Sequence, residues 1–464
     1  MKKGPPILFV PPSTSAEGFA DMGRSFVIIF CGAFQPGGDA VFLLPELKFW
    51  REHGFRVILF SAKKPEEELL PPDEGISLEE LTPPAITIPA LLRTLFSLLG
   101  KKMYYRELLE ILRSAPNPKN AAVAVKKHLL GAAALRQLES KLRELDIRQN
   151  DTVVLYSYWL EYFSLAAAEC PVPSDHVLRI GRAHGYDLYD NQPGNGYMPW
   201  RRARISRLDH VYAASIAGAD FLKKKFPDLK DKISSACLGS DDFSFQEYVP
   251  SKTLRLVSCS WLVPVKRVEL IIEALAQIKD ISIKWTHIGT GPEEEKLKGL
   301  AKKLLAPNVQ CDWRGFLSNQ QVKQVYRTEC FDLFVTTSAS EGGRPVSISE
   351  ALSCGIPAAG CPSGGIPEVI IPGETGFLLD AARPADSLKC AVLDYWHLPS
   401  ERKLALRRSC RHFFEDHCSA EQHAKVFVKR IAEKFGRASL LPADAERKSV
   451  FNESSIPCCE RRNE

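Results

Sequence analysis

The sequence lacks any long apolar run. A membrane-spanning helix needs about 20 consecutive apolar residues, whereas the apolar runs here are short, as at residues 26–30. Near the start of the chain only residues 7–10 form an apolar run, and a secretory signal needs one of about 7–15 residues. We therefore expect a cytoplasmic protein, and a position at the inner face of the membrane stays open.

Several metal and phosphate motifs are also missing. The 13 cysteines include no C-x-x-C pair, which argues against a zinc ribbon or a dithiol redox site. There is no Gly-Lys-Ser/Thr phosphate loop and no Asp-x-Asp motif for a metal-bound diphosphate. The stretch 289–291 lacks the third glycine of the dinucleotide fingerprint, because position 294 is Glu294. The net charge of +5 is too weak to indicate a nucleic-acid partner.

What the sequence contains is a rhythm of strand, loop and helix that occurs twice. At 464 residues the chain exceeds one ordinary core, and two domains of about 200 residues are expected. An apolar strand at 26–30 leads into a glycine-containing loop at 32–39, a helix and a second strand at 57–60. The same order starts again at residue 254. This alternation predicts an α/β fold of two Rossmann-like, doubly wound parallel-sheet domains facing a central cleft.

The strongest candidate site is the segment 338–352, which follows an apolar strand and begins a helix. Gly342 and Gly343 allow the backbone to come close to a ligand, and a proline suits the first helical position. The N–H groups of Val346 and Ser347 at the helix start would attract a phosphate group. The segment therefore predicts a phosphate-binding turn.

Two glutamates in this segment suit the sugar parts of a nucleotide-sugar. Glu350 lies about a turn and a half inside the helix, where its carboxylate could reach ribose hydroxyls. Glu341 lies in the loop and could accept hydrogen bonds from the transferred sugar. The alternative is an ordinary helix start that carries a surface glutamate.

Together with further pieces downstream and upstream, this segment resembles the second domain of glycosyltransferase family 4. The matching pieces are Leu262-Val263-Pro264-Val265-Lys266-Arg267, Arg314-Gly315-Phe316-Leu317, Gly364-Gly365-Ile366-Pro367-Glu368 and Gly373-Glu374-Thr375-Gly376. The resemblance covers about residues 25–435 and is densest over 254–380. It implies the two-domain GT-B fold, retention of the anomeric configuration, and a nucleotide-sugar co-substrate with no metal or other cofactor.

On this basis we expect five parts. They are a flexible leader at 1–24, an acceptor-side domain at 25–248, a nucleotide-sugar-binding domain at 249–418, a helix at 419–436 that crosses back to the first domain, and a disordered tail at 437–464.

The resemblance also assigns roles to individual residues. Lys266 would contact the donor diphosphate, because a fixed cation stabilises the charge that a departing nucleoside diphosphate gains. Glu341 would hold the donor sugar as a catalytic residue, and Glu350 would bind the nucleotide ribose. Gly37 and Gly38 would line the cleft from the first domain. A solvated lysine at a helix start is the alternative for Lys266.

Two features depart from the family pattern. Trp261 stands where the family has the arginine of a Gly-Arg pair, so one diphosphate cation is missing unless Arg267 or another residue substitutes for it. Eight residues separate Glu341 from Glu350, where the family has seven. Either the loop bulges by one residue, or Gly342 occupies the place of the first glutamate.

In the first domain, His184 lies in a glycine-containing loop after a predicted strand. The resemblance implies that it is catalytic and contacts the donor sugar near the reacting centre, although a lone histidine is more often structural. Arg182 could stabilise an acidic acceptor or a donor phosphate, or form a structural salt bridge. Tyr158, Trp159 and Tyr162 could form a sugar-stacking surface or pack in the core.

We therefore expect a retaining, metal-independent hexosyltransferase. Its acceptor would be a polysaccharide or lipid-linked oligosaccharide in capsule, exopolysaccharide or lipopolysaccharide biosynthesis, by analogy with the family. The leucine-rich basic segment 84–112 could touch lipid as an amphipathic helix pair or pack on the sheet. The alternatives are a noncatalytic nucleotide-sugar-binding GT-B subunit and a GT-B sugar-nucleotide epimerase.

Overall fold

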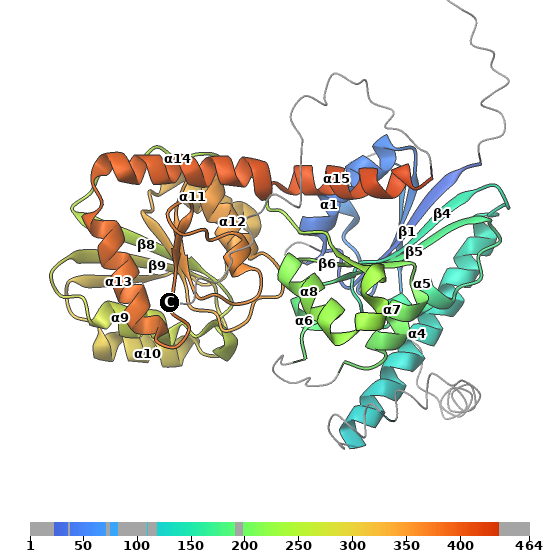
Figure 1. The fold of residues 1–464 in the computed structure, drawn as a ribbon, viewed down its shortest axis with the longest axis horizontal. Helices are drawn as coiled ribbons and strands as arrows, with labels where there is room; N and C mark the ends of the chain where they lie inside the picture. Colours follow the sequence, from blue (N-terminus) through green and yellow to red (C-terminus); the bar gives the residue numbers. More distant parts are fainter. Residues whose placement is uncertain are drawn as a thin grey trace, which may run out of the picture.

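The computed structural model describes residues 23–35, 38–70, 75–81, 109, 118–190 and 198–435. Almost all of the leader and the basic segment 84–112, as well as Gly37 and the tail 437–464, lie outside the described residues. The chain forms two α/β domains, one after the other in sequence (Figure 1). The predicted fold class is therefore confirmed. None of the described helices is long and apolar enough to cross a membrane.

The first domain is built on a seven-stranded sheet in the order β3-β2-β1-β4-β5-β6-β7, and neighbouring strands are parallel. The strands are β1 (Ser25–Cys31), β2 (Arg56–Ser61), β3 (Ile76–Glu80), β4 (Thr152–Ser157), β5 (His176–Ala183), β6 (His210–Ala213) and β7 (Ile233–Ser235). Val27 of β1 lies opposite Val57 and Val154. Every residue of β1 and β4 is buried, as expected for central strands that have helices on both faces.

Helices cover both faces of this sheet. They are α1 (Ala40–Glu52), α4 (Pro118–Glu144), α5 (Phe163–Glu169), α6 (Gly185–Leu188), α7 (Arg201–Arg207) and α8 (Ile216–Lys225), with short 3₁₀ turns η2 (Glu67–Leu69) and η3 (Pro227–Lys232). Successive side chains of β1 enter different cores. Phe26 and Ile28 pack with α4, α5 and α8, whereas Val27 and Ile29 pack with α1.

The second domain has a six-stranded parallel sheet in the order β10-β9-β8-β11-β12-β13. The strands are β8 (Thr253–Cys259), β9 (Ser282–Ile288), β10 (Val309–Trp313), β11 (Leu333–Thr336), β12 (Ala358–Gly360) and β13 (Gly376–Leu378). The helices are α9 (Glu269–Ala276), α10 (Glu294–Leu304), α11 (Asn319–Thr328), α12 (Val346–Ser353), α13 (Pro384–His397) and α14 (Ser400–His417), with η4 (Pro264–Lys266) and η5 (Ile366–Glu368). One core packs α9, α10 and α13 on the sheet, and another packs α11, α12 and α14 on it.

The last helix returns to the first domain. Helix α15 (Ala420–Glu433) follows α14 almost in line, and the two helices lie along different domains (Figure 1). Phe427 and Val428 of α15 belong to the core that α1 forms on the first sheet. At the crossing Ser240 N donates to Cys418 O at 2.8 Å, and Ala420 N donates to Ser240 O at 3.0 Å. The chain therefore crosses between the domains twice, with both crossings side by side.

Candidate active site

The site lies where the carboxyl ends of strands from both domains face each other. In the first domain α6 and α8 lie on the side that faces the second domain (Figure 1). A Cβ atom built on Gly342 would lie 1.6 Å from the Cα of Gly185, so the two backbones are in direct contact. Ser215 Oγ donates to Gly342 O at 3.2 Å. The predicted glycine turn of the second domain therefore touches the loop that contains His184.

The glycine loop after β1 is held by Asp39, a residue that sequence reasoning missed. Its Oδ2 accepts hydrogen bonds from Gly32 N at 2.6 Å, Ala33 N at 3.1 Å and Trp159 Nε1 at 3.0 Å. Burial raises the pKa of this carboxyl, and the three hydrogen bonds partly offset the rise. Gly38 lies directly before it, where a Cβ would approach Ala33 O to 2.6 Å. An acidic residue after a glycine pair was the available signal.

His184 is buried and packs against two aromatic rings. Its ring centroid lies 4.5 Å from that of Trp159 and 4.7 Å from that of Tyr158. Nε2 lies 2.8 Å from Tyr158 O, and because a carbonyl only accepts, Nε2 carries the proton. Burial, and secondarily the charge of Arg182, lowers the pKa of His184 to about 3. The imidazole is therefore neutral at physiological pH.

Asp187 fixes the backbone around His184. Its Oδ1 accepts from His184 N at 2.5 Å, and its Oδ2 accepts from Leu160 N at 2.5 Å. Burial raises the pKa of this carboxyl to about 7, although the hydrogen bond from His184 N opposes that rise. The Asp187 side chain thus joins the segments that follow β4 and β5.

Arg182 forms a buried ion pair in the first domain. Its guanidinium contacts the Glu46 carboxylate of α1 and donates to Tyr156 Oη at 3.1 Å. Both charged side chains are at most 2% exposed. The guanidinium also lies over the ring of Phe427 of α15, 4.4 Å from its centroid. Of the two roles considered for Arg182, the structure has the salt bridge.

The aromatic side chains after β4 differ in burial. Tyr158 is fully buried, whereas Trp159 and Tyr162 are partly buried. Tyr162 packs on Phe163 with ring centroids 4.0 Å apart. Trp159 joins the site through a polar side-chain contact, because its indole donates to Asp39.

In the second domain the structure brings Lys266 and Glu341 together. Lys266 Nζ lies 2.5 Å from Glu341 Oε1, and both side chains are less than a quarter exposed. The turn that contains Lys266 is joined to the loop after β11, since Ala339 N donates to Val265 O at 2.8 Å. The Glu341 carboxylate thus points toward the residue predicted to meet the diphosphate.

Arg267 has a different orientation. Its Nε donates to Thr337 O at 2.8 Å, and its φ of 48° places it in the left-handed region. Trp261, which replaces the family's arginine, is 53% exposed, and Phe316 after β10 is 68% exposed. The carboxyl edge of the second sheet therefore presents two large aromatic side chains to solvent.

Helix α12 begins directly after the glycine turn. Ile348 N donates to Pro345 O at 3.1 Å, and the N–H groups of Val346 and Ser347 precede the first possible intrahelical bond. The backbone of Gly343 lies against Gly365, where a Cβ would approach Gly343 O to 2.4 Å. The predicted phosphate-binding groups therefore lie at a helix start, and the glycine turn before that helix packs directly against the backbone of Gly365.

Glu350 is buried inside α12. It is 5% exposed, and Asn319 Nδ2 of α11 donates to its Oε1 at 3.0 Å. Burial raises the pKa of Glu350 to about 8, and the bond from Asn319 opposes that rise. This excludes the alternative of a surface glutamate. Sequence reasoning missed Asn319, whose only signal is its position at a helix start after β10.

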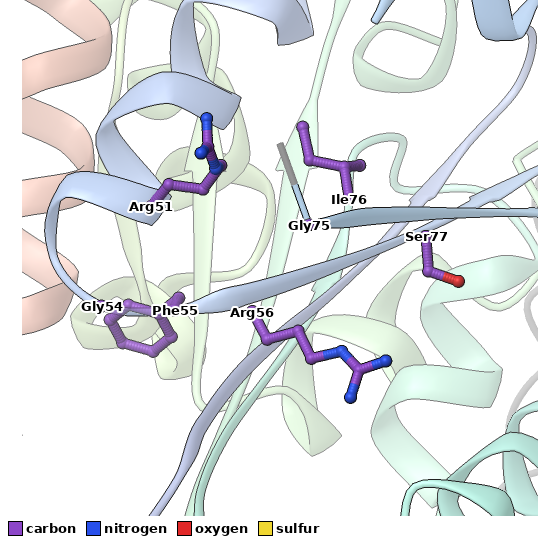
Figure 2. Close-up of a pocket in the computed structure, with 7 residues that line it drawn as sticks. All are labelled: Arg51, Gly54, Phe55, Arg56, Gly75, Ile76 and Ser77. Atoms are coloured by element: carbon purple, nitrogen blue, oxygen red, sulfur yellow. The ribbon is translucent and has the colours of Figure 1, made fainter. Parts of the chain in front are cut away.

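A surface depression lies away from these residues. It has a volume of about 670 Å³. It is located where β2 and β3 begin (Figure 2), whereas His184 follows the carboxyl end of β5. Its lining residues are Arg51, Gly54, Phe55, Arg56, Gly75, Ile76 and Ser77. The two arginines point in different directions in Figure 2, so they do not converge on one ligand position. Among the described residues, no three or more His, Cys, Asp or Glu side chains gather as metal ligands would.

Solved structures show which class of fold this is. The chain is similar over 90% of its length to a glycosyltransferase from Rickettsia africae, with a TM-score of 0.64 and 13% identity over the whole of that chain. It is also similar to the lipopolysaccharide outer core galactosyltransferase WaaB, with a TM-score of 0.60 and 16% identity, covering 89% of this chain and 100% of that one. Anabaena HepE, solved with UDP and glucose, has a TM-score of 0.58 at 15% identity, covering 89% and 99%. The two-domain architecture is the GT-B fold.

Sequence comparisons are more specific for the second domain. Residues 240–410 match the family model of glycosyl transferases group 1. The protein named "Putative colanic acid biosynthesis glycosyltransferase WcaL" of Escherichia coli is 26% identical over 204 residues, which are 42% of this chain and 50% of WcaL. The N-acetyl-alpha-D-glucosaminyl L-malate synthase of Bacillus anthracis is 33% identical over 117 residues, 25% of this chain and 29% of that protein.

The matched parts are limited in length. The chain spans about half the length of the first curated relatives it matches. Within these limits the predicted resemblance is confirmed, because residues 240–410 match the family model of glycosyl transferases group 1.

Proposed function

We propose that this protein is a retaining glycosyltransferase that moves a sugar from a nucleoside-diphosphate sugar to a saccharide acceptor. The observation that carries the proposal is the pairing of Lys266 with Glu341 beside the start of α12, where the second domain touches the His184 loop. A cation and the N–H groups of a helix start suit a diphosphate. The match of residues 240–410 to the group 1 family supports the same reading.

In the proposed mechanism the donor lies mainly on the second domain. Lys266 would exchange Glu341 for the diphosphate and offset the negative charge that develops as it departs. The N–H groups at the start of α12 would donate hydrogen bonds to a phosphate oxygen. Glu350 would hold the ribose hydroxyls, and Glu341 would be released to hold the transferred sugar.

The acceptor hydroxyl would attack from the face that the diphosphate leaves. A bond forms between the acceptor oxygen and the anomeric carbon, while the bond from that carbon to the phosphate oxygen breaks. The proton passes from the acceptor hydroxyl to the departing phosphate. The configuration is retained because the new bond forms on the same face as the bond that breaks. The low pKa makes the buried imidazole of His184 a weak base, so it would bind the sugar as a polar group rather than remove a proton. No metal ion takes part in these proposed steps.

The class of acceptor comes from the relatives. WcaL is named for colanic acid biosynthesis, and WaaB is named for the lipopolysaccharide outer core. We therefore propose a polysaccharide or lipid-linked oligosaccharide acceptor, used at the inner face of the membrane in surface polysaccharide biosynthesis.

A second candidate function is nucleotide-sugar binding without turnover. Trp261 in place of the family's arginine favours it, because an exposed indole supplies no positive charge to a departing diphosphate. This candidate predicts nucleotide binding and no transfer.

One experiment separates the two candidates. The purified protein is incubated with UDP-, GDP-, ADP- and CMP-type sugars, with EDTA and with or without lipid-linked saccharides, and nucleotide release is measured. Release from one donor that persists in EDTA and is lost in His184→Ala supports the transferase. Anomeric proton couplings of the product then test retention. Nucleotide binding without release supports the noncatalytic candidate.

A further inference from the structure

The side chain of Glu368 bridges the two domains. Glu368 ends η5 in the second domain, and its Oε1 accepts from Ala217 N at 2.9 Å. Its Oε2 accepts from Ile216 N at 3.2 Å. Ile216 and Ala217 are the first two residues of α8 in the first domain. A carboxylate from one domain therefore occupies the positive end of a helix in the other.

The cap of α8 is completed from its own domain. Ser215 Oγ accepts from Gly218 N at 3.0 Å, the usual arrangement at a helix start. The same hydroxyl donates to Gly342 O at 3.2 Å. A helix start leaves its first N–H groups without intrahelical partners. In α8 the second domain satisfies Ile216 N and Ala217 N. Gly218 N is satisfied by Ser215, which itself contacts the second domain.

The side chain of Arg344, in the loop between β11 and α12, contacts both Glu368 and the end of α14, where the chain crosses between the domains. Its Nε lies 3.2 Å from Glu368 Oε2, and its Nη1 donates to His417 O at 2.7 Å. The side chains are 3% and 10% exposed, respectively. Arg344 follows Gly343 directly, so a side chain from the predicted phosphate turn reaches both the bridging carboxylate and the end of α14.

The two loops that carry these side chains are packed backbone to backbone. A Cβ on Gly364 would lie 1.6 Å from Glu341 O, and one on Gly365 would lie 2.4 Å from Gly343 O. The loop of Glu368 therefore cannot shift without displacing the loop of Glu341. Interiors packed this closely transmit displacement rather than absorb it.

We infer that Glu368 is a positioning residue that holds the two domains closed over the donor, and that Arg344 couples this closure to the loop of Glu341. Substrate entry and product release require the cleft to open, and opening separates Glu368 from α8. The effect on transfer rests on the proposed function, whereas the effect on closure does not.

The test uses the full chain with Glu368→Gln, which keeps the size of the side chain and removes its charge. A matched control is Glu374→Gln, an exposed glutamate of the same domain. Ile216→Pro removes one N–H donor from the first-domain side, at the helix position that tolerates proline best. Radii of gyration are measured by small-angle X-ray scattering without ligand, together with thermal unfolding.

We expect a larger radius of gyration for Glu368→Gln and Ile216→Pro than for Glu374→Gln, with unfolding temperatures that show all three folded. With the donor that gives nucleotide release, we expect Glu368→Gln to lower kcat/KM about tenfold to a hundredfold, the range for losing a charge-assisted hydrogen bond, while nucleotide affinity stays the same. A radius of gyration equal to that of the control overturns the role in closure, even if the protein transfers no sugar. A changed radius with unchanged kcat/KM in an active protein overturns the positioning role.

Discussion

Asp39 Oδ2 accepts a hydrogen bond from the indole Nε1 of Trp159 at 3.0 Å, across 120 residues of sequence. The same oxygen accepts from Gly32 N and Ala33 N, and the Trp159 ring packs on His184. The Asp39 carboxylate therefore sets the position of the glycine loop and of the Trp159 ring that packs on His184. The first-domain half of the site is built around Asp39.

We predict that Asp39→Ala disturbs both stability and transfer. Three partly buried donors would lose their acceptor, and water can replace part of the loss, whereas one fully buried unsatisfied donor costs about 1–3 kcal/mol. We expect the free energy of unfolding to fall by about 2 kcal/mol, and kcat/KM to fall at least tenfold because Trp159 no longer holds His184. Urea unfolding and initial rates check this. Asp231→Ala, at an exposed aspartate, is the control, and equal results for both variants would refute the assignment.

Lys266→Met should separate chemistry from folding. Lys266 is the cation nearest to Glu341 in the proposed donor site, at 2.5 Å, and losing one group that stabilises developing charge costs about 10²–10³ in kcat. We expect a loss of this size in nucleotide release with little change in unfolding temperature. Lys298→Met removes a lysine of α10 that is paired with Glu294 and serves as the control. A rate within twofold of the control would exclude Lys266 from the site.

The pH dependence of stability tests the burial of His184. Because its folded pKa is about 3 and the unfolded value is about 6.5, its contribution to stability is present above about pH 6.5. That contribution is lost as the pH falls toward 3. We expect His184→Asn to flatten the loss of stability between pH 6.5 and 4, measured by urea unfolding. His176→Asn, at an exposed position, is the control, and parallel profiles for wild type and His184→Asn would contradict this burial.

The fold could be predicted from the sequence because it rests on local patterns. The apolar strand expected at 26–30 is β1 (Ser25–Cys31), and the helix expected after the glycine turn is α12 (Val346–Ser353). Apolar runs bounded by glycine loops are short-range signals. The resemblance, which is densest over residues 254–380, also falls within residues 240–410, which match the group 1 family model.

The side-chain partners within the site could not be predicted in this way. Arg182 pairs with Glu46, which is 136 residues away, and Glu368 binds Ala217 across 151 residues. No spacing in the sequence encodes such contacts, because they depend on how the helices pack on the sheets and how the domains meet. The burial of Glu350 could not be predicted for the same reason, since its hydrogen-bond partner Asn319 lies on a different helix.

Glu350 provides the sharpest test of the second-domain half of the site. Burial raises its folded pKa to about 8, above the unfolded value of about 4.3. The folded state therefore binds the proton more tightly, so the contribution to stability is fully present below about pH 4.3 and is lost as the pH rises through about 8. An ionised carboxylate at this position destabilises the free protein at alkaline pH.

Glu350→Gln removes this ionisation while keeping a group that can accept from Asn319. We expect the variant to be more stable than wild type at pH 9, by at least about 1 kcal/mol since each pKa unit is worth about 1.4 kcal/mol, and to bind the donor nucleotide at least tenfold more weakly. Thermal unfolding from pH 5 to 9 and calorimetric titration measure the two effects, with Glu295→Gln at an exposed position of α10 as control. A gain in stability with a loss of binding is what a ligand-binding carboxylate predicts. A variant that is less stable at pH 9, or that binds the nucleotide as wild type does, would show that Glu350 serves the core and not the ribose.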